Sequence, residues 1–357
     1  MKRSSPFIIP LFLPHAACPH HCLFCNQKTL HPGPFPDQSS LGMERDRWLA
    51  FPRDKDRPVE VAFFGGNFLG LPEKILHACL SLVAEIPGAG LRFSTRPDTI
   101  SSTSLGLLKS WEGRATAELG VQSLDEEVLR RAGRGHDVGA VSRAVQILRT
   151  AGMRVGAQMM LGLPGASEKS DLNSARSLAA LKVDFARVSP TLVLAGSGLA
   201  RLYHRGRYHP LSLDEAVSRS ASVVDILEKA CIPVVRIGLQ ADAALVESLV
   251  AGPHHPALGE WVRGFLLANQ VLEVMAGLGR APLGKGFVIR VSTRLRGRLQ
   301  GMGGCNMARF QKEAFPASLW VKTEKNVLPD FWSVEHAFLE AAAPFKGPPL
   351  DPWRQAR

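Results

Sequence analysis

Three closely spaced cysteines stand near the start of the chain. Cys18, Cys22 and Cys25 follow an apolar run, Phe7–Leu13, that predicts a β-strand. Spacings of three and two intervening residues allow one loop to donate three thiolates to three irons of a cubane. One loop cannot easily supply a fourth ligand, so one iron is left open to a chelating small molecule. The spacing therefore predicts a [4Fe–4S] cluster.

A zinc site is the alternative reading of the same loop. It would use the three cysteines and one of three nearby histidines, His15, His20 or His21. Zinc sites usually take two ligands from each of two separated knuckles, and no second cysteine pair exists in the sequence. The other cysteines, Cys79, Cys231 and Cys305, are isolated and are expected to be small apolar fillers. The sequence favours the iron–sulfur cluster.

Two predicted strands, 115–121 and 155–161, carry polar residues on one face. Their alternate positions hold Thr116, Glu118, Gly120 and Gln122, and Gly156, Gln158, Met160 and Gly162. A filled barrel would carry Val, Ile and Leu there, so the small residues are expected to leave space for a ligand. Because a lone carboxylate in an apolar barrel is costly, the alternative role of Glu118 is an ion pair with Arg96 or Arg187.

The rest of the first 240 residues supplies elements that can position these groups. Short apolar runs predict strands at 7–13, 59–64, 91–95, 115–121, 155–161, 185–189 and 233–237. Helical patterns between them cover 72–86, 138–151, 168–181 and 212–230. This alternation predicts a parallel sheet in an α/β fold, a partial (β/α)6-type TIM barrel with a small α+β C-terminal extension. We expect a barrel over 1–240, the extension over 241–343 and a Pro-rich, poorly ordered tail over 344–357.

Charge and composition narrow the class of partner. The 357 residues carry a net charge of +11, from 43 basic and 32 acidic side chains, which favours an anionic partner such as nucleic acid. The alternative is a basic protein that binds no anion. The early apolar run Phe7–Pro14 is too short to span a bilayer, and crowded cysteines indicate a reducing compartment, so we expect a cytoplasmic protein without membrane contact.

The cysteine motif resembles that of the radical S-adenosylmethionine (SAM) superfamily, with aromatic Phe24 before the last cysteine. The resemblance implies that SAM chelates the open iron and that one-electron reduction cleaves it to a 5′-deoxyadenosyl radical. The reductant would be a flavodoxin or ferredoxin. The sequence Gly65-Gly66-Asn67 stands at the end of a predicted strand, where the superfamily has Gly-Gly-Glu or Gly-Gly-Thr and binds SAM largely through the backbone. Asn67 departs from that pattern.

Several other segments are similar to the catalytic subunit of Elongator and its short bacterial relatives. These segments are 93–98, 118–123, 134–137, 158–165 and 187–193. Oxygen-independent coproporphyrinogen oxidases share some of these segments but match the rest less well. The resemblance implies that Glu118, Gln122 and Gln158 contact SAM, with Arg96 nearby. In segment 134–137, His136 is either a proton donor or acceptor or an exposed loop residue.

The C-terminal extension carries a basic stretch. Residues 285–312 contain no acidic side chain and seven basic ones: Lys285, Arg290, Arg294, Arg296, Arg298, Arg309 and Lys312. The predicted order of strand, helix, Gly301–Gly304 loop, helix and strand resembles a KH-type module, which implies RNA binding. The alternatives are a plain cap over the barrel and, on the short pattern 298–304, an acetyltransferase-like phosphate loop. Too few residues surround that pattern to build an acetyltransferase domain.

These observations lead to three hypotheses. The first is a radical SAM enzyme that modifies RNA, plausibly tRNA, through hydrogen abstraction. The second keeps this chemistry but has a small-molecule substrate, as a coproporphyrinogen oxidase does. The third is a non-catalytic binding protein with a degenerate SAM site, prompted by Asn67.

Overall fold

A computed structural model describes residues 6–14, 17–27, 33–54, 56–111, 113–239 and 243–338. The chain divides into two compact units, Met1–His254 and His255–Arg357. The predicted tail over 344–357 lies outside the described residues, as does Gln240, the end of the predicted barrel.

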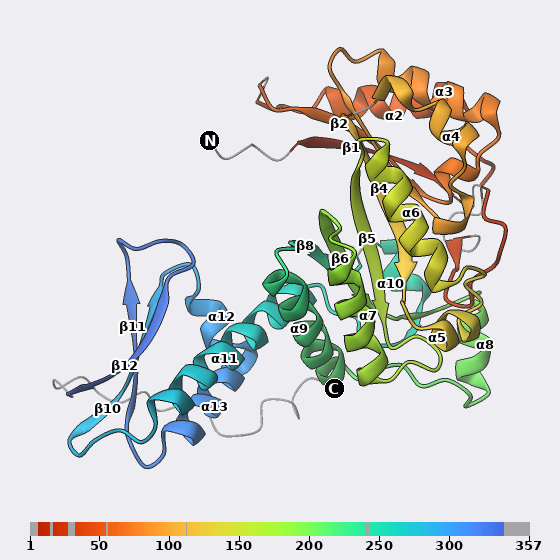
Figure 1. Cartoon of the computed structure of the whole chain (residues 1–357). Helices are drawn as coiled ribbons and strands as arrows, with labels where there is room; N and C mark the ends of the chain where they lie inside the picture. The colour runs from red at the N-terminus through yellow and green to blue at the C-terminus, as the bar shows by residue number, and fades with distance from the viewer. Residues whose placement is uncertain are drawn as a thin grey trace. The chain divides into compact units, whose positions relative to one another are not determined.

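The first unit is built on a parallel seven-stranded sheet of order β1-β2-β3-β4-β5-β6-β8, curled into a half-barrel (Figure 1). Its strands are β1 Phe7–Leu13, β2 Val59–Gly65, β3 Gly90–Thr95, β4 Ala115–Gln122, β5 Arg154–Leu161, β6 Phe185–Pro190 and β8 Val234–Ile237. A second, two-stranded sheet pairs β7 Val193–Leu194 with β9 Leu249–Ala251. The predicted α/β fold with a partial barrel is confirmed.

Each strand has one apolar face that packs against the helices and one face that points into the half-barrel. In β1, Ile9, Leu11 and Leu13 are buried, while Ile8 and Phe12 line the inner cavity. Successive side chains of a strand point to opposite faces, so the alternation fixes which residues meet the helices and which face the cavity.

Helices follow the strands and cover the outer face of the sheet (Figure 1). They are α2 Gln38–Leu49, α3 Glu73–Ala84, α4 Ser102–Gly106, α5 Glu126–Arg131, α6 Val138–Thr150, α7 Glu168–Ala180, α8 Gly198–His204, α9 Leu213–Lys229 and α10 Ala243–Ser248. Side-chain oxygens of Asp137, Ser167 and Ser212 accept from backbone N–H groups in the first turns of α6, α7 and α9. These caps explain why the helices begin there.

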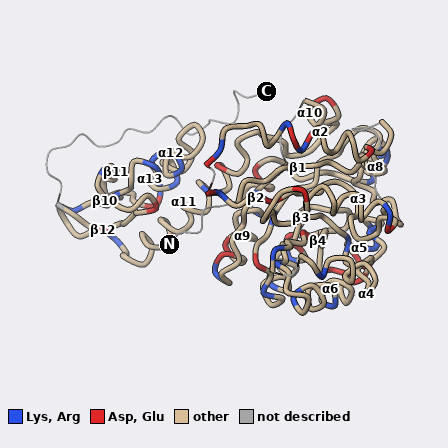
Figure 2. The backbone as a smooth tube through the Cα atoms, turned by 90° about the horizontal axis from the view of Figure 1, so that it is seen from above, with Lys and Arg blue, Asp and Glu red and all other residues tan. Residues whose placement is uncertain are grey.

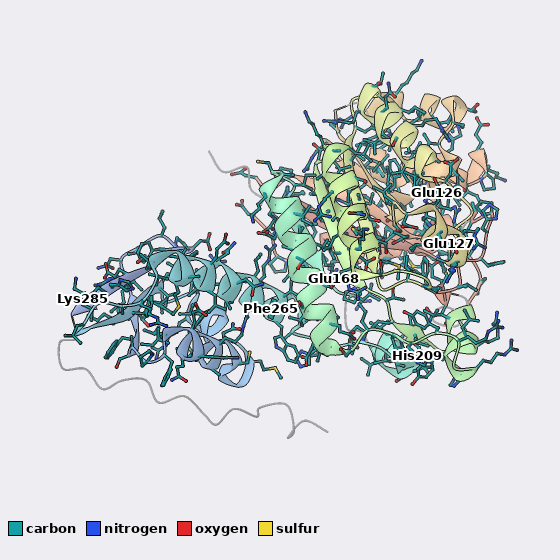
Figure 3. All side chains as sticks on the ribbon, turned by 60° about the horizontal axis from the view of Figure 1, so that its bottom comes forward. Glu126, Glu127, Glu168, His209, Phe265 and Lys285 are labelled. Atoms are coloured by element: carbon teal, nitrogen blue, oxygen red, sulfur yellow. The ribbon has the colours of Figure 1, made fainter. Side chains whose placement is uncertain are left out.

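The second unit joins three helices to a three-stranded sheet. It contains α11 Leu258–Leu278, β10 Lys285–Ser292, α12 Arg296–Gln300, α13 Cys305–Ala314, β11 Leu319–Glu324 and β12 Trp332–Phe338. The central strand β10 pairs parallel with β11 and antiparallel with β12. Phe265 on α11 and Lys285 at the start of β10 are labelled in Figure 3. An apolar core between α11, α13 and the sheet includes Val271, Ile289 and Phe310.

Candidate functional site

The cysteine loop leaves the end of β1 and is held by segments that come much later in the sequence. The Leu23 N–H donates to the Ala132 carbonyl over 3.0 Å, and the Leu23 carbonyl accepts from the Leu199 N–H over 2.7 Å. A Cβ on Gly198 would lie 2.7 Å from a methyl group of Leu23 and 3.3 Å from its Cα, so glycine eases this close approach. The aromatic residue of the motif, Phe24, packs against two separate apolar clusters. The backbone of the loop is thus fixed on both sides.

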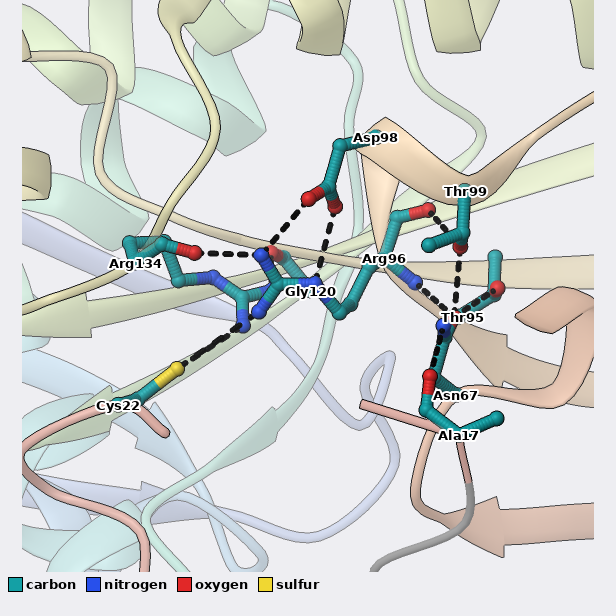
Figure 4. A network of polar contacts seen from close by, with 9 residues as sticks. All are labelled: Ala17, Cys22, Asn67, Thr95, Arg96, Asp98, Thr99, Gly120 and Arg134. Carbon is teal, nitrogen blue, oxygen red and sulfur yellow. Dashed lines mark hydrogen bonds and ion pairs between the residues drawn. The ribbon is translucent and has the colours of Figure 1, made fainter. Parts of the chain in front are cut away.

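Two guanidinium groups meet the sulfur of Cys22, which is buried while Cys18 and Cys25 are exposed. Arg134 Nη1 lies 3.4 Å and Arg96 Nη1 3.8 Å from Cys22 Sγ (Figure 4). Asp98 accepts two hydrogen bonds of 2.9 Å from Arg96. Arg96 also donates to the Arg134 carbonyl. The site therefore offers positive charge to a thiolate at Cys22.

Gly65 and Gly66 bring the end of β2 against the end of β1. The Gly66 N–H donates to the Leu13 carbonyl over 2.8 Å, and a Cβ on Gly65 would lie 2.6 Å from the same oxygen. Gly65 also has φ of 109°, a conformation that favours glycine. The glycine pair thus permits a close backbone approach directly before the cysteine loop.

Asn67 is fully buried, and its side chain is engaged within the protein. Its Nδ2 donates to the Ala17 carbonyl over 2.9 Å, while its Oδ1 accepts from Thr95, Thr99 and the Arg96 N–H (Figure 4). The departure from the superfamily pattern at this position therefore has a structural role.

Glu118 lies in a chain of ion pairs inside the half-barrel. Its two oxygens accept from Arg92 Nη1 at 2.8 Å and Arg187 Nη1 at 2.9 Å, and Arg92 Nε donates to Glu60 over 2.8 Å. The predicted alternative of an ion pair with Arg187 is present. The alternative ion pair between Glu118 and Arg96 is absent. Arg96 pairs with Asp98 beside Cys22, and the second partner of Glu118 is Arg92.

Gln158 and Gln122 face different surroundings. Gln158 lines the cavity with Glu118. Gln122 is buried with φ of 68° close to Arg134, because its Nε2 and Arg134 Nη2 both lie near the Cβ position of Gly120. The structure thus places Gln122 toward the cysteine loop and Gln158 in the lumen.

Gly120 in β4, Gly156 in β5 and Gly162 directly after β5 do not leave empty space. A Cβ on Gly156 would lie 2.2 Å from the Phe185 ring, one on Gly120 2.6 Å from Arg134, and one on Gly162 2.7 Å from Leu211. The expectation that they make room for a ligand is wrong, because side chains from neighbouring elements fill these positions.

The ligand-sized space lies instead in the lumen, in a cavity of about 1770 Å³. Its walls combine aromatic and aliphatic residues with charged ones. They include Ile8, Pro10, Phe12, Phe64, Phe185, Glu60, Arg92, Ser94, Glu118, Gln158 and Arg187.

Two arginines were not predicted as site residues, and of the two alternatives for His136 the exposed loop residue is wrong. Arg92 lies two residues before Ser94 on β3, so the two side chains point to the same, inner face. Strand alternation could therefore have predicted its position. Arg134 was noted only within a motif. His136 is buried, not exposed, and burial together with the positive charge of Arg134 lowers its pKa to about 4.

Comparison with known proteins agrees with this geometry. A model of the radical SAM superfamily matches residues 13–178, and a model of the radical SAM C-terminal domain matches residues 183–266. The chain is a radical SAM enzyme. Its cofactors are accordingly a [4Fe–4S] cluster and SAM.

Relatives of this radical SAM enzyme include Elongator proteins. An uncharacterised protein of Methanocaldococcus jannaschii is 27% identical over 75% of the chain and 79% of its own length. Elongator complex protein 3 of Saccharomyces cerevisiae is 32% identical over 54% of the chain but only 38% of its own length. A tRNA uridine(34) acetyltransferase of Methanocaldococcus infernus is 29% identical over 44% of the chain and 28% of its length. The chain thus spans about a third of these two longer relatives.

The fold has a solved counterpart. The archaeal Elp3 of Methanocaldococcus infernus, with an N-terminal deletion, superposes with a TM-score of 0.59 at 22% identity, covering 80% of this chain and 71% of that chain. The similarity supports the radical SAM fold of the half-barrel.

The residues around the cysteine loop fit the two cofactors. Within the described residues, buried polar atoms without a protein partner occur here: Gln122 Oε1 and Arg134 Nε. Buried polar atoms normally have partners, so these point to a polar bound group. Three cysteines of one loop supply the thiolates that an iron–sulfur cluster requires.

The described residues lack two features. They contain no helix long and apolar enough to cross a membrane. Nor do they gather three or more His, Cys, Asp or Glu side chains into a group that could hold a metal ion, so the thiols of Cys18, Cys22 and Cys25 do not form such a group here, and their assignment to the cluster rests on their spacing. His15, a candidate ligand of the alternative zinc site, lies outside them.

Proposed function

We propose that the protein modifies RNA, namely tRNA, by hydrogen abstraction at its radical SAM site. The observation that carries the chemistry is the meeting of Cys22 with Arg96 and Arg134 beside the glycine strand end. When bound, the cluster and SAM supply a 5′-deoxyadenosyl radical after reduction, for which we propose a flavodoxin or ferredoxin.

The chain's own residues would bind and orient the cluster and SAM. Cys18, Cys22 and Cys25 would hold the cluster. Contacts to SAM are proposed for the backbone of Gly65, Gly66 and Asn67 and for the side chains of Arg96, Glu118, Gln122 and Gln158. Because Asn67 and Glu118 already use their side chains within the protein, Gln122 and Gln158 are the stronger candidates for polar side-chain contacts.

Two observations support RNA as the substrate class. One similar protein is named a tRNA uridine(34) acetyltransferase. In the second unit, several Lys and Arg positions lie along the backbone around α12 and α13 (Figure 2). Arg294, Arg296 and Lys312 are exposed, and no ion pair within the described residues involves them. Arg290 and Arg298 instead pair with glutamates, and Arg309 contacts Asn269 and the Phe265 ring.

The backbone of the second unit supports a KH-like role for the glycine loop. The order β10, α12, loop, α13, β11 encloses Gly301, Gly303 and Gly304, all with positive φ. A Cβ on Gly301 would lie 2.7 Å from Asn306, so the turn requires glycine. A glycine loop between two helices can approach a nucleic-acid backbone closely.

The test compares RNA and metabolites as substrates. Anaerobically reconstituted protein is incubated with SAM, dithionite and either total tRNA or a metabolite extract, and 5′-deoxyadenosine is measured. We expect acceleration by tRNA. Acceleration only by the extract would favour a small-molecule substrate, and no 5′-deoxyadenosine under any condition would support the non-catalytic hypothesis.

A second arm tests the basic surface. Arg294→Glu with Arg296→Glu should weaken tRNA binding at least tenfold and reduce its dependence on salt, because fewer phosphate-bound cations are displaced. Arg201→Glu with Arg205→Glu in the first unit makes the same change of charge and serves as control. Equal loss in both pairs would contradict RNA binding by the second unit.

A further inference from the structure

One row of the sheet connects the cysteine site to the far wall of the cavity. Gly120, Gln158, Arg187 and Arg236 are register neighbours on β4, β5, β6 and β8. The Gly120 carbonyl accepts from Arg134, which also contacts Cys22 Sγ. Neighbouring strands lie about 4.8 Å apart, so the backbone of Gly120 is roughly 14 Å from that of Arg236. A substrate of nucleotide size can span this row.

The wall formed by β5, β6 and β8 is rich in positive charge. The acidic side chains that line the cavity are Asp56, Glu60 and Glu118, and the basic ones are Arg57, Arg92, Arg154, Arg187 and Arg236. Both oxygens of Glu118 are already used by Arg92 and Arg187. Arg187 and Arg236 are register partners on β6 and β8, and both side chains line the cavity. Burial and the charge of Arg187 lower the pKa of Arg236, while Glu118 acts in the opposite direction.

The neighbouring side chains hold this wall in place. Arg92 and Arg154 both lie over the Phe185 ring, 5.3 and 5.8 Å from its centre. That ring occupies the space left by Gly156. Nη1 of Arg187 donates a hydrogen bond to Glu118. A guanidinium carries five N–H donors, so other donors of Arg187 can bind a ligand.

We propose that Arg187 and Arg236 form a subsite for an oxyanion of the substrate, a phosphate or a carboxylate. Paired guanidinium groups match planar or tetrahedral oxyanions through two parallel hydrogen bonds. An anion held there leaves the part of the cavity beside Gln158 for the reacting carbon. The inference rests on the proposed function, because it places the substrate in this same cavity, and it adds that the substrate bears an oxyanion.

The test measures binding to the anaerobically reconstituted holoprotein by equilibrium dialysis. The probes are uridine, uridine 5′-monophosphate and, as competitor, succinate. The monophosphate should bind about tenfold more tightly than uridine, and Arg187→Gln or Arg236→Gln should abolish this preference. Arg236→Lys should retain part of this preference, because lysine keeps the positive charge but lacks the two parallel N–H donors of a guanidinium group. Arg176→Gln on the outer helix α7 is the matched control.

Competition separates the two sources of oxyanion. Displacement of the monophosphate by succinate would assign the subsite to carboxylates as well, and its failure would assign it to phosphates. Equal binding of uridine and its monophosphate, no binding of either anion, or an unchanged preference in Arg236→Gln would overturn the proposal. SAM cleavage by the wild-type protein is measured in parallel. If SAM is cleaved but the protein shows no preference for the monophosphate, only the subsite is refuted. If the preference is present but SAM is not cleaved, only the proposed function is refuted.

Discussion

The side-chain amide of Asn67 donates a 2.9 Å hydrogen bond to the carbonyl of Ala17, the residue directly before the first cysteine. The carbonyl oxygen of the same side chain accepts from Thr95, Thr99 and the Arg96 N–H. One buried residue at the end of β2 thus joins the cysteine loop to the end of β3. Asn67 is a positioning residue.

Replacing Asn67 should loosen the loop. Asn67→Ala leaves several buried groups without partners, so we expect the free energy of unfolding to fall by about 3 kcal/mol. Asn67→Asp keeps the acceptor oxygen but removes the donor to Ala17, and should lower iron content with a smaller loss of stability. Urea denaturation and iron analysis measure the two effects. Wild-type iron content in both variants would refute the positioning role.

Cluster loading should depend on the three loop cysteines alone. Cys18→Ala, Cys22→Ala and Cys25→Ala should each lose most of the about four irons that reconstitution installs per chain. Cys79→Ala is the matched control, because burial raises the pKa of Cys79 to about 12 and keeps it a neutral thiol. Comparable iron loss in the control would contradict the assignment.

Arg134 should tune the cluster. Its guanidinium lies 3.4 Å from Cys22 Sγ, and a nearby positive charge stabilises the reduced, more negative form. Arg134→Gln should therefore lower the reduction potential by on the order of tens of millivolts, measured by a redox titration followed by electron paramagnetic resonance. Arg130→Gln, at an exposed position of α5, should leave the potential unchanged. An unaltered potential in a fully loaded Arg134→Gln protein would disprove the effect.

His136 should make stability depend on pH. Its folded pKa of about 4 lies below the ordinary value of 6.5, so protonation favours the unfolded chain. The stability contribution is complete above the ordinary value and is lost as pH falls toward the folded value. Between about pH 7.5 and pH 5 the loss should be roughly 2 kcal/mol. His136→Leu should flatten this part of the profile in urea denaturation, whereas parallel profiles would argue against the assignment.

Much of the fold could be predicted because its elements have local signatures. The apolar runs of all seven main strands appear in the sequence, and helix α13 follows the Gly301–Gly304 loop in the predicted order. The short strand β7 and strand β12 were not predicted. Their strand character depends on pairing with β9 and β10, and local sequence does not specify pairing between distant segments.

The same limit applies to the site. The cysteine spacing and the glycine pair are local features, and the structure gives each a geometric reason. The partner of Glu118 depends on how β3 pairs with β4. Ser94 lies opposite Glu118 in the register, and Arg92, two residues earlier on the same face of β3, reaches the carboxylate, whereas Arg96 lies beyond the end of β3. Whether the space beside Gly156 is empty depends on the Phe185 ring of β6, which fills it. Strand alternation shows which face a residue takes but not which neighbour fills the space.

The backbone hydrogen bonds that hold Leu23 bear on how the protein matures. The cysteines leave the ribosome early, yet the loop acquires its last anchor only when Leu199, in the second half of the chain, has been synthesised and has folded. Until then the three thiols have no fixed geometry and are exposed to oxidants and stray metal ions. Cluster delivery is therefore expected to act on a nearly complete half-barrel after translation, and expression under oxygen should damage these cysteines before the protein can protect them.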